Sequence, residues 1–142
     1  FDLVFDQDLD IDYVDATGEL LSDKSRLATC FQIWKRTPTP RTPVKIKDMG
    51  VIEKVSPEDA DVSLTIFGYG CGNLKKNFER VPNTTQLFLK LNHPKALAAL
   101  ESVDFSRFYK STAYTEALSL QEINYLLNEE IFGNPMIESG SK

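Results

Sequence analysis

Two apolar segments near the N-terminus have the spacing of β-strands. Residues 1–5 (FDLVF) place apolar side chains at alternate positions with one extra valine, and residues 27–34 (LATCFQIW) are rich in aromatic and β-branched types. The polar stretch between them, 6–23, contains the turn-forming sequence DATG. We therefore expect an antiparallel hairpin with a long loop.

Further strands are predicted beyond a proline-rich stretch. Three prolines in residues 37–43 (TPTPRTP) exclude a helix or a central strand there, so we expect an extended loop. Two short alternating segments follow around a Met-Gly turn, and two longer apolar segments come later. The four predicted strands are 44–47, 51–55, 61–67 and 86–91.

Two helices are predicted in the C-terminal half of the chain. A proline near the first helical position favours a short helix over about 94–103. A longer helix starts at Ser119, which has the capping-box spacing with Glu122, and its apolar residues fall on one face. Gly133 and Pro135 end this helix.

These elements predict an α+β fold of short, mostly antiparallel strands with two helices. The length of 142 residues fits one domain, which we place at 1–134, followed by a frayed tail at 135–142. Within the domain, 1–36 forms the hairpin, 37–59 a proline-rich and basic connection, and 60–134 the remaining strands and both helices.

Composition excludes several classes of protein. With 42% hydrophobic residues, the chain has enough apolar surface for a core, which argues against wholesale disorder. No apolar run approaches the ~20 residues that a membrane helix needs, and no secretory signal is visible. Two cysteines are too few for a disulfide framework, and a single histidine beside them argues against a zinc site. We expect an intracellular protein without a membrane segment.

Charge is distributed unevenly along the first third of the chain. Residues 1–23 carry eight acids and no base, whereas residues 24–47 carry seven bases and no acid. Such asymmetry can mark a polyanion-binding surface beside an acidic flank. The alternative, which the net charge of -5 favours, is that the two stretches are neighbouring strands whose charges neutralise each other.

Three patterns suggest chemistry, and each has a simpler explanation. Acids in 8–19 occupy four positions of a calcium loop, but Tyr13 stands where its sharp turn needs glycine, which favours a solvated acidic loop. The glycines of 68–72 (GYGCG) follow a predicted strand, yet no acid is placed to bind a ribose, which favours a glycine-rich turn or bulge. Cys71 has no basic cluster around it to activate its thiol. We expect no catalytic, cofactor-binding or metal-binding residue in this chain.

Several blocks of the sequence resemble, in the same order, phage and microbial S-adenosylmethionine-dependent methyltransferase-like proteins, which are related to DNA adenine-N6 methyltransferases. FDLVF at 1–5 and ATCFQIWKR at 28–36 carry the more specific part of this likeness. ADVSLTIFGYGCG at 60–72, TQLFLK at 85–90 and FSRFYKSTA at 105–113 follow in the family's order. The resemblance therefore spans most of the chain.

The resemblance implies that the chain is the C-terminal, substrate-side or scaffold part of a methyltransferase-like protein. Its hairpin would correspond to the last two strands of a class I methyltransferase sheet. The family's cofactor-binding glycine motif and Asn-Pro-Pro-aromatic motif would lie upstream of Phe1, so this chain alone would hold no cofactor and be inactive, whereas the parent protein would bind S-adenosylmethionine. Lys35, Arg36 and Arg41 would contact nucleic-acid phosphates as positioning charges.

The same resemblance implies a partner for the hairpin. Its inner edge would expose unpaired N–H and C=O groups unless another polypeptide completed the sheet. The aromatic face of Phe31, Ile33 and Trp34 would also need a covering layer. The alternative function is a non-catalytic structural or interaction subunit of a larger assembly that has kept this scaffold. A further alternative is a free-standing anion- or nucleotide-binding module that uses residues 68–72.

Overall fold

The computed structural model describes residues 1–21, 29–39, 42–112 and 114–138. The chain divides into two compact units, Phe1–Pro43 and Val44–Lys142, and each is described here by itself. This division differs from the predicted single domain over 1–134. The boundary falls at the end of the proline-rich stretch, where prolines fix φ and remove the backbone donors that would carry a strand ladder onward.

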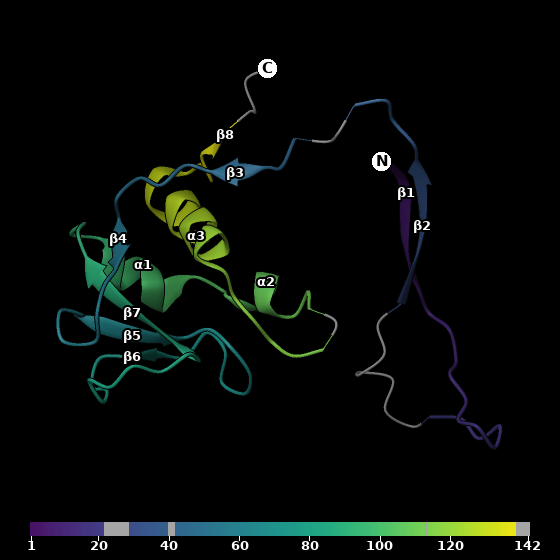
Figure 1. Cartoon of the computed structure of the whole chain (residues 1–142), viewed down its shortest axis with the longest axis horizontal. Coiled ribbons are helices and arrows are strands. Elements are labelled where there is room, and N and C mark those ends of the chain that lie inside the picture. The colour runs from purple at the N-terminus through teal and green to yellow at the C-terminus, as the bar shows by residue number, and fades with distance from the viewer. Residues whose placement is uncertain (22–28, 40–41, 113, 139–142) are drawn as a thin grey trace. The chain divides into compact units, whose positions relative to one another are not determined.

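The N-terminal unit contains the predicted antiparallel hairpin. Strand β1 (Asp2–Leu9) pairs with β2 (Thr29–Lys35), so the first strand runs four residues beyond the predicted end at Phe5 (Figure 1). The register shifts between Leu3 and Phe5, which makes Val4 the extra residue of a β-bulge. The extra valine in the sequence pattern is therefore absorbed by the bulge.

The two faces of the hairpin differ in chemistry. Residues directly opposite each other point to the same side, which places Phe5, Ile33 and Phe31 on one face. The rings of Phe5 and Phe31 meet edge to face with their centroids 6.1 Å apart. Trp34 lies on the other face with Gln32, whose carbonyl accepts a hydrogen bond from the indole N–H. The prediction that Trp34 shares the face of Phe31 and Ile33 is wrong, because successive side chains alternate along a strand.

The C-terminal unit is built on a four-stranded antiparallel sheet. Its strands are β4 (Ile52–Lys54), β5 (Val62–Thr65), β6 (Leu74–Lys75) and β7 (Gln86–Leu91), in the spatial order β4-β7-β5-β6. The predicted strand at 86–91 is confirmed as β7, and that at 61–67 is confirmed as the shorter β5, which ends at Thr65. The predicted strands on either side of the Met-Gly turn do not pair with each other, because β4 joins β7 instead.

A second, two-stranded ladder joins distant parts of this unit. Strand β3 (Lys45–Ile46) pairs with β8 (Ile137–Glu138), and the side-chain amide of Asn128 donates hydrogen bonds to the backbone carbonyls of Lys47 and Pro135. The prediction of a frayed tail over 135–142 is therefore wrong at Ile137–Glu138, while 139–142 lie outside the described residues.

Three helices complete the described part of the chain: α1 (Ala96–Ser102), α2 (Ser106–Tyr109) and α3 (Leu120–Phe132). The two predicted helices are α1 and α3, and the single turn α2 is additional. The predicted start of α3 is confirmed, since Ser119 and Glu122 form a capping box. Gly133 ends the helix in the left-handed conformation.

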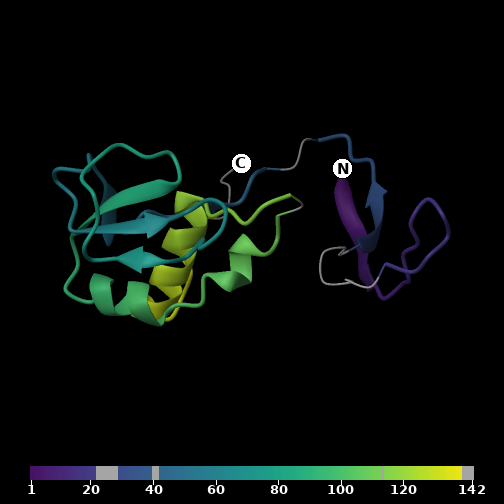
Figure 2. The ribbon, with the colours of Figure 1, turned by 90° about the horizontal axis from the view of Figure 1, so that it is seen from below.

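The core lies between the sheet and two of the helices. Helices α1 and α3 cover one face of the sheet (Figures 1 and 2), and alternate residues of β5 and β7 point toward them. The buried apolar side chains of this core include Val51, Ile52, Val62, Leu64, Leu87, Leu89, Ala96, Ala99, Leu100, Ile123, Leu126 and Leu127. The opposite face of the sheet is thus left for other contacts.

Candidate functional site

The residues predicted to contact phosphate lie at the end of the hairpin. Lys35 is the last residue of β2 and stands opposite Asp2 in the ladder. Arg36 follows it and is exposed, whereas Arg41 lies outside the described residues. In the described ladder Asp2 is the one acid of β1 that stands opposite a base, whereas Asp6 and Asp8 face Gln32 and Cys30, so charge balance between the strands rests on this single pair.

The acidic stretch 8–19 begins inside a strand and continues into a hydrogen-bonded turn. Asp8 belongs to β1 and stands opposite Cys30, a strand position that does not favour it as the first residue of a calcium loop. Asp15 accepts hydrogen bonds at one carboxylate oxygen from the hydroxyl and backbone N–H of Thr17 and from the N–H of Glu19. The Thr17 hydroxyl, followed by these amides, lowers the pKa of Asp15. Over the described residues, no group of three or more His, Cys, Asp or Glu side chains could hold a metal ion.

The glycine segment 68–72 is a structural turn. Gly68, Gly70 and Gly72 all have positive φ, and the N–H of Gly72 bonds to the carbonyl of Thr65 at 2.7 Å. Cys71 is buried within this turn, and burial raises the pKa of its thiol to about 11. The thiol therefore stays protonated at neutral pH, which argues against a nucleophile.

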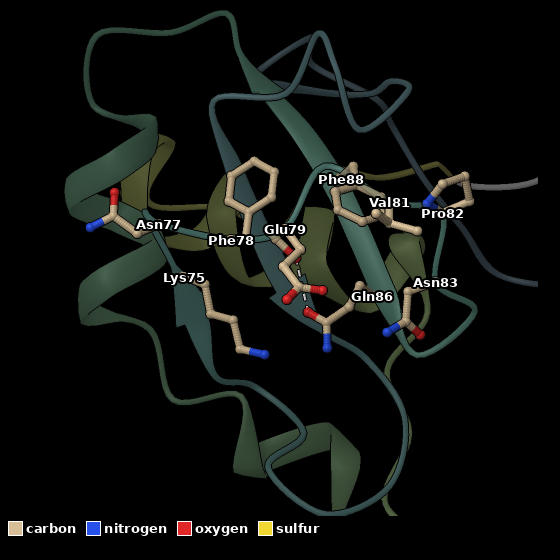
Figure 3. A pocket seen from close by; sticks show the side chains of 10 residues that line it. Lys75, Asn77, Phe78, Glu79, Val81, Pro82, Asn83, Gln86 and Phe88 are labelled. Atoms are coloured by element: carbon tan, nitrogen blue, oxygen red, sulfur yellow. Dashed lines mark hydrogen bonds between the residues drawn. The ribbon is translucent and has the colours of Figure 1, made fainter.

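A pocket of about 360 Å³ opens on the face of the sheet that α1 and α3 leave uncovered (Figure 3). Ser63 stands opposite both Lys75 and Phe88 in the ladders, so these three residues form one row across β6, β5 and β7. Residues 77–83 follow β6 and form the rest of the wall. The complete lining is Ser63, Lys75, Asn77, Phe78, Glu79, Val81, Pro82, Asn83, Gln86 and Phe88.

The floor of the pocket is a small hydrogen-bonded network. Ser63 is almost completely buried, and its hydroxyl donates to the side-chain carbonyl of Gln86 at 2.9 Å. The Thr65 hydroxyl lies 3.3 Å from the same oxygen and accepts a bond of 3.0 Å from the Gln86 amide. Because each hydroxyl is satisfied by Gln86, polar groups can sit on a buried strand at little cost.

One part of the wall is aromatic, and Arg80 holds it in place. The rings of Phe78 and Phe88 lie 5.7 Å apart between centroids, and the Arg80 guanidinium stands 5.1 Å from the centre of the Phe78 ring. Nη1 of Arg80 also reaches the backbone carbonyls of Pro57, Glu58 and Ala60 at 2.8, 2.8 and 3.1 Å. Arg80 thereby ties the loop after β6 to the segment before β5.

Part of this pocket could be predicted from the sequence pattern. Ser63 and Thr65 alternate with apolar residues in the predicted strand 61–67, which indicates a polar face. Gln86 begins the strand that pairs with it. The contribution of Phe78 and Glu79 was not predictable, because the path of an irregular loop depends on contacts such as those of Arg80.

No protein-family model, no curated protein sequence and no solved structure matches this chain. Among the helices of the described residues, none is long and apolar enough to cross a membrane.

Proposed function

We propose that this chain is the C-terminal, substrate-side or scaffold part of a methyltransferase-like protein, and that another polypeptide segment completes its N-terminal hairpin. The observation that carries the proposal is the openness of this hairpin. All eight residues of β1 are exposed, and Phe5, Phe31 and Ile33 on the apolar face are 43%, 52% and 48% exposed. If the resemblance to methyltransferase-like proteins holds, the completing strands would be those of a class I methyltransferase sheet.

A two-stranded hairpin of this kind has little stability by itself. An isolated hairpin is at best marginally stable in water, because two strands bury too little apolar surface to offset the entropy of ordering them. Within the described residues, β1 and β2 form a sheet of their own with no third strand. Strand addition at an edge would supply backbone hydrogen bonds, and a layer over Phe5, Phe31 and Ile33 would remove their surface from water.

The proposal includes a role for the end of β2. Lys35 and Arg36 would stand beside the completed sheet and contact phosphates of a nucleic-acid substrate as positioning charges, and Arg41 would extend this set. We also place the protein inside the cell, on sequence grounds: two cysteines cannot build the disulfide framework common in small secreted domains.

The coding sequence upstream of Phe1 tests the proposal first. It should encode a glycine-rich cofactor motif and an Asn-Pro-Pro-aromatic motif. The polypeptide carrying them, produced together with this chain, should bind S-adenosylmethionine in calorimetry, while this chain alone should not. An upstream sequence without these motifs would favour the structural or interaction subunit, and a one-to-one complex of this chain alone with the cofactor would refute its catalytic incompleteness.

Hydrogen exchange tests whether the hairpin is the completed element. Amides of β1 and β2 should exchange rapidly in the isolated chain. In the complex of this chain with the upstream polypeptide, they should exchange roughly tenfold or more slowly. Phe31→Thr should weaken the association, since it removes an aromatic ring from the apolar face. Gln32→Thr is the matched control, because it changes the neighbouring residue on the other face and keeps a good strand former. Equal effects of the two substitutions would contradict the proposed docking face.

A further inference from the structure

We propose that the pocket between β5, β6, β7 and the loop 77–83 binds a free α-amino acid with a large apolar side chain. This inference is independent of the proposed methyltransferase relationship, because it rests on the lining residues of the C-terminal unit alone. The volume of about 360 Å³ lies within the range of small-molecule sites.

The hydrogen-bonding groups left over in the pocket are mainly donors. The Gln86 carbonyl is already occupied by Ser63 and Thr65, which leaves an amide N–H of Gln86 for a ligand. The Asn83 carbonyl accepts from both the N–H and the hydroxyl of Thr85 at 2.9 Å, which leaves its NH₂ group. With the ammonium of Lys75, these donors match the acceptor oxygens of a carboxylate.

One carboxylate side chain completes the charge pattern. Glu79 is the acid among the ten lining residues, and Figure 3 shows it between Lys75 and the side chain of Phe88. A phosphate or a dicarboxylate would meet this negative charge without a compensating group of its own. A zwitterion instead places its carboxylate toward Lys75 and its ammonium toward Glu79, so both charges of the pocket gain an opposite partner.

The apolar part of the lining sets the preference for the side chain. Phe78 and Phe88 offer ring surfaces, and Val81 and Pro82 extend this surface along the loop (Figure 3). A flat or branched apolar group can contact these rings. The bonds of Arg80 to the segment before β5 hold Phe78 in place before any ligand arrives, which lowers the ordering cost of binding.

The test is a titration of the full chain with L-phenylalanine, followed by amide chemical shifts in NMR. Shift changes should concentrate at Ser63, Lys75, Glu79 and Gln86. 3-Phenylpropionate lacks the ammonium and phenethylamine lacks the carboxylate, so each should bind at least roughly tenfold more weakly, a loss of one charge pair. Absence of shifts at these residues up to millimolar ligand, or equal binding of all three compounds, would overturn the proposal.

Two substitutions test which charged residue of the pocket binds which charge of the ligand. Lys75→Met should weaken phenylalanine binding roughly tenfold, and Lys90→Met, at an exposed position of β7 outside the pocket, should not. Glu79→Gln should remove the preference for phenylalanine over 3-phenylpropionate. Thymidine serves as a flat ligand without a zwitterion; if it binds in this pocket and phenylalanine does not, the site takes nucleobases and the proposal is wrong.

Discussion

Gly72 provides a sharp test of whether the glycine segment serves packing. Its φ is +86°, and a Cβ added there would lie 3.0 Å from the Cβ of Phe105 and 3.2 Å from a ring carbon of Tyr109. Gly70 has nearly the same φ, +83°, but a Cβ there would meet nothing within 4 Å. Comparing the stabilities of the two Gly→Ala variants therefore separates the cost of backbone strain from the cost of steric contact within one turn.

The expected losses differ between the two positions. The left-handed conformation costs a residue with a Cβ roughly 1–2 kcal/mol, so Gly70→Ala should lose about that amount. Gly72→Ala should lose the same strain plus roughly 1–3 kcal/mol for overpacking against the buried Phe105 side chain, about 2–5 kcal/mol in total. Phe105 is 5% exposed and belongs to the core, so it cannot move aside freely.

Urea unfolding followed by helical far-UV circular dichroism measures both variants. This signal reports on the C-terminal unit, which contains all three described helices, whereas the single tryptophan, Trp34, lies in the hairpin. With a denaturant slope of about 2 kcal/mol/M, Gly72→Ala should lower the midpoint by roughly 1–2.5 M. Equal midpoints for the two variants would refute the close approach to Phe105 and reopen a ligand-binding role for the turn.

Three further outcomes follow from the geometry. Ser119→Ala should destabilise the C-terminal unit by about 1 kcal/mol in the same urea assay, since it removes the acceptor of the capping box; an unchanged midpoint would contradict the cap. Cys30, which is exposed, should react with a thiol reagent at pH 8 in the native state, while Cys71, whose pKa is raised to about 11 by burial, should react only after unfolding; equal native rates would contradict this burial. If the complex of this chain with the upstream polypeptide binds DNA, changing Lys35 and Arg36 together to Gln should make the dependence of its affinity on salt shallower, by the equivalent of about two phosphate contacts. An unchanged salt dependence would show that these residues do not contact the DNA.

Local signals in the sequence predicted α3 and the hairpin well. The capping residues of α3 and its final glycine act within one or two turns, so neighbouring residues suffice to place the helix. The hairpin was predicted because its two strands are close in sequence and rich in strand-forming residues. The face of Trp34 was missed, because a nearly continuous apolar run hides the alternation that decides which way each side chain points.

Elements that depend on distant residues were not predictable. The ladder between Lys45–Ile46 and Ile137–Glu138 contains two residues on each side, too few for a pattern of alternation, and Asn128 stabilises it from α3. The single turn α2 is likewise too short for helical periodicity to emerge. The pocket needed both the pairing of β5 with β7 and the loop that Arg80 holds in place.

The contrast between the two units strengthens the case for a partner at the hairpin. In the C-terminal unit, Leu64 and Leu89 are fully buried and the second face of the sheet carries satisfied polar groups, so this sequence is able to close its own core. In the hairpin, Phe31 and Ile33 keep about half of their surface in water. A chain that buries apolar side chains so completely in one unit would lose stability by leaving an aromatic face open in the other, because a half-exposed ring forgoes roughly half of the ~1.5–3 kcal/mol that full burial supplies. Coverage by the proposed strands and a further layer would remove this cost, and Phe31→Thr would then weaken the association most directly.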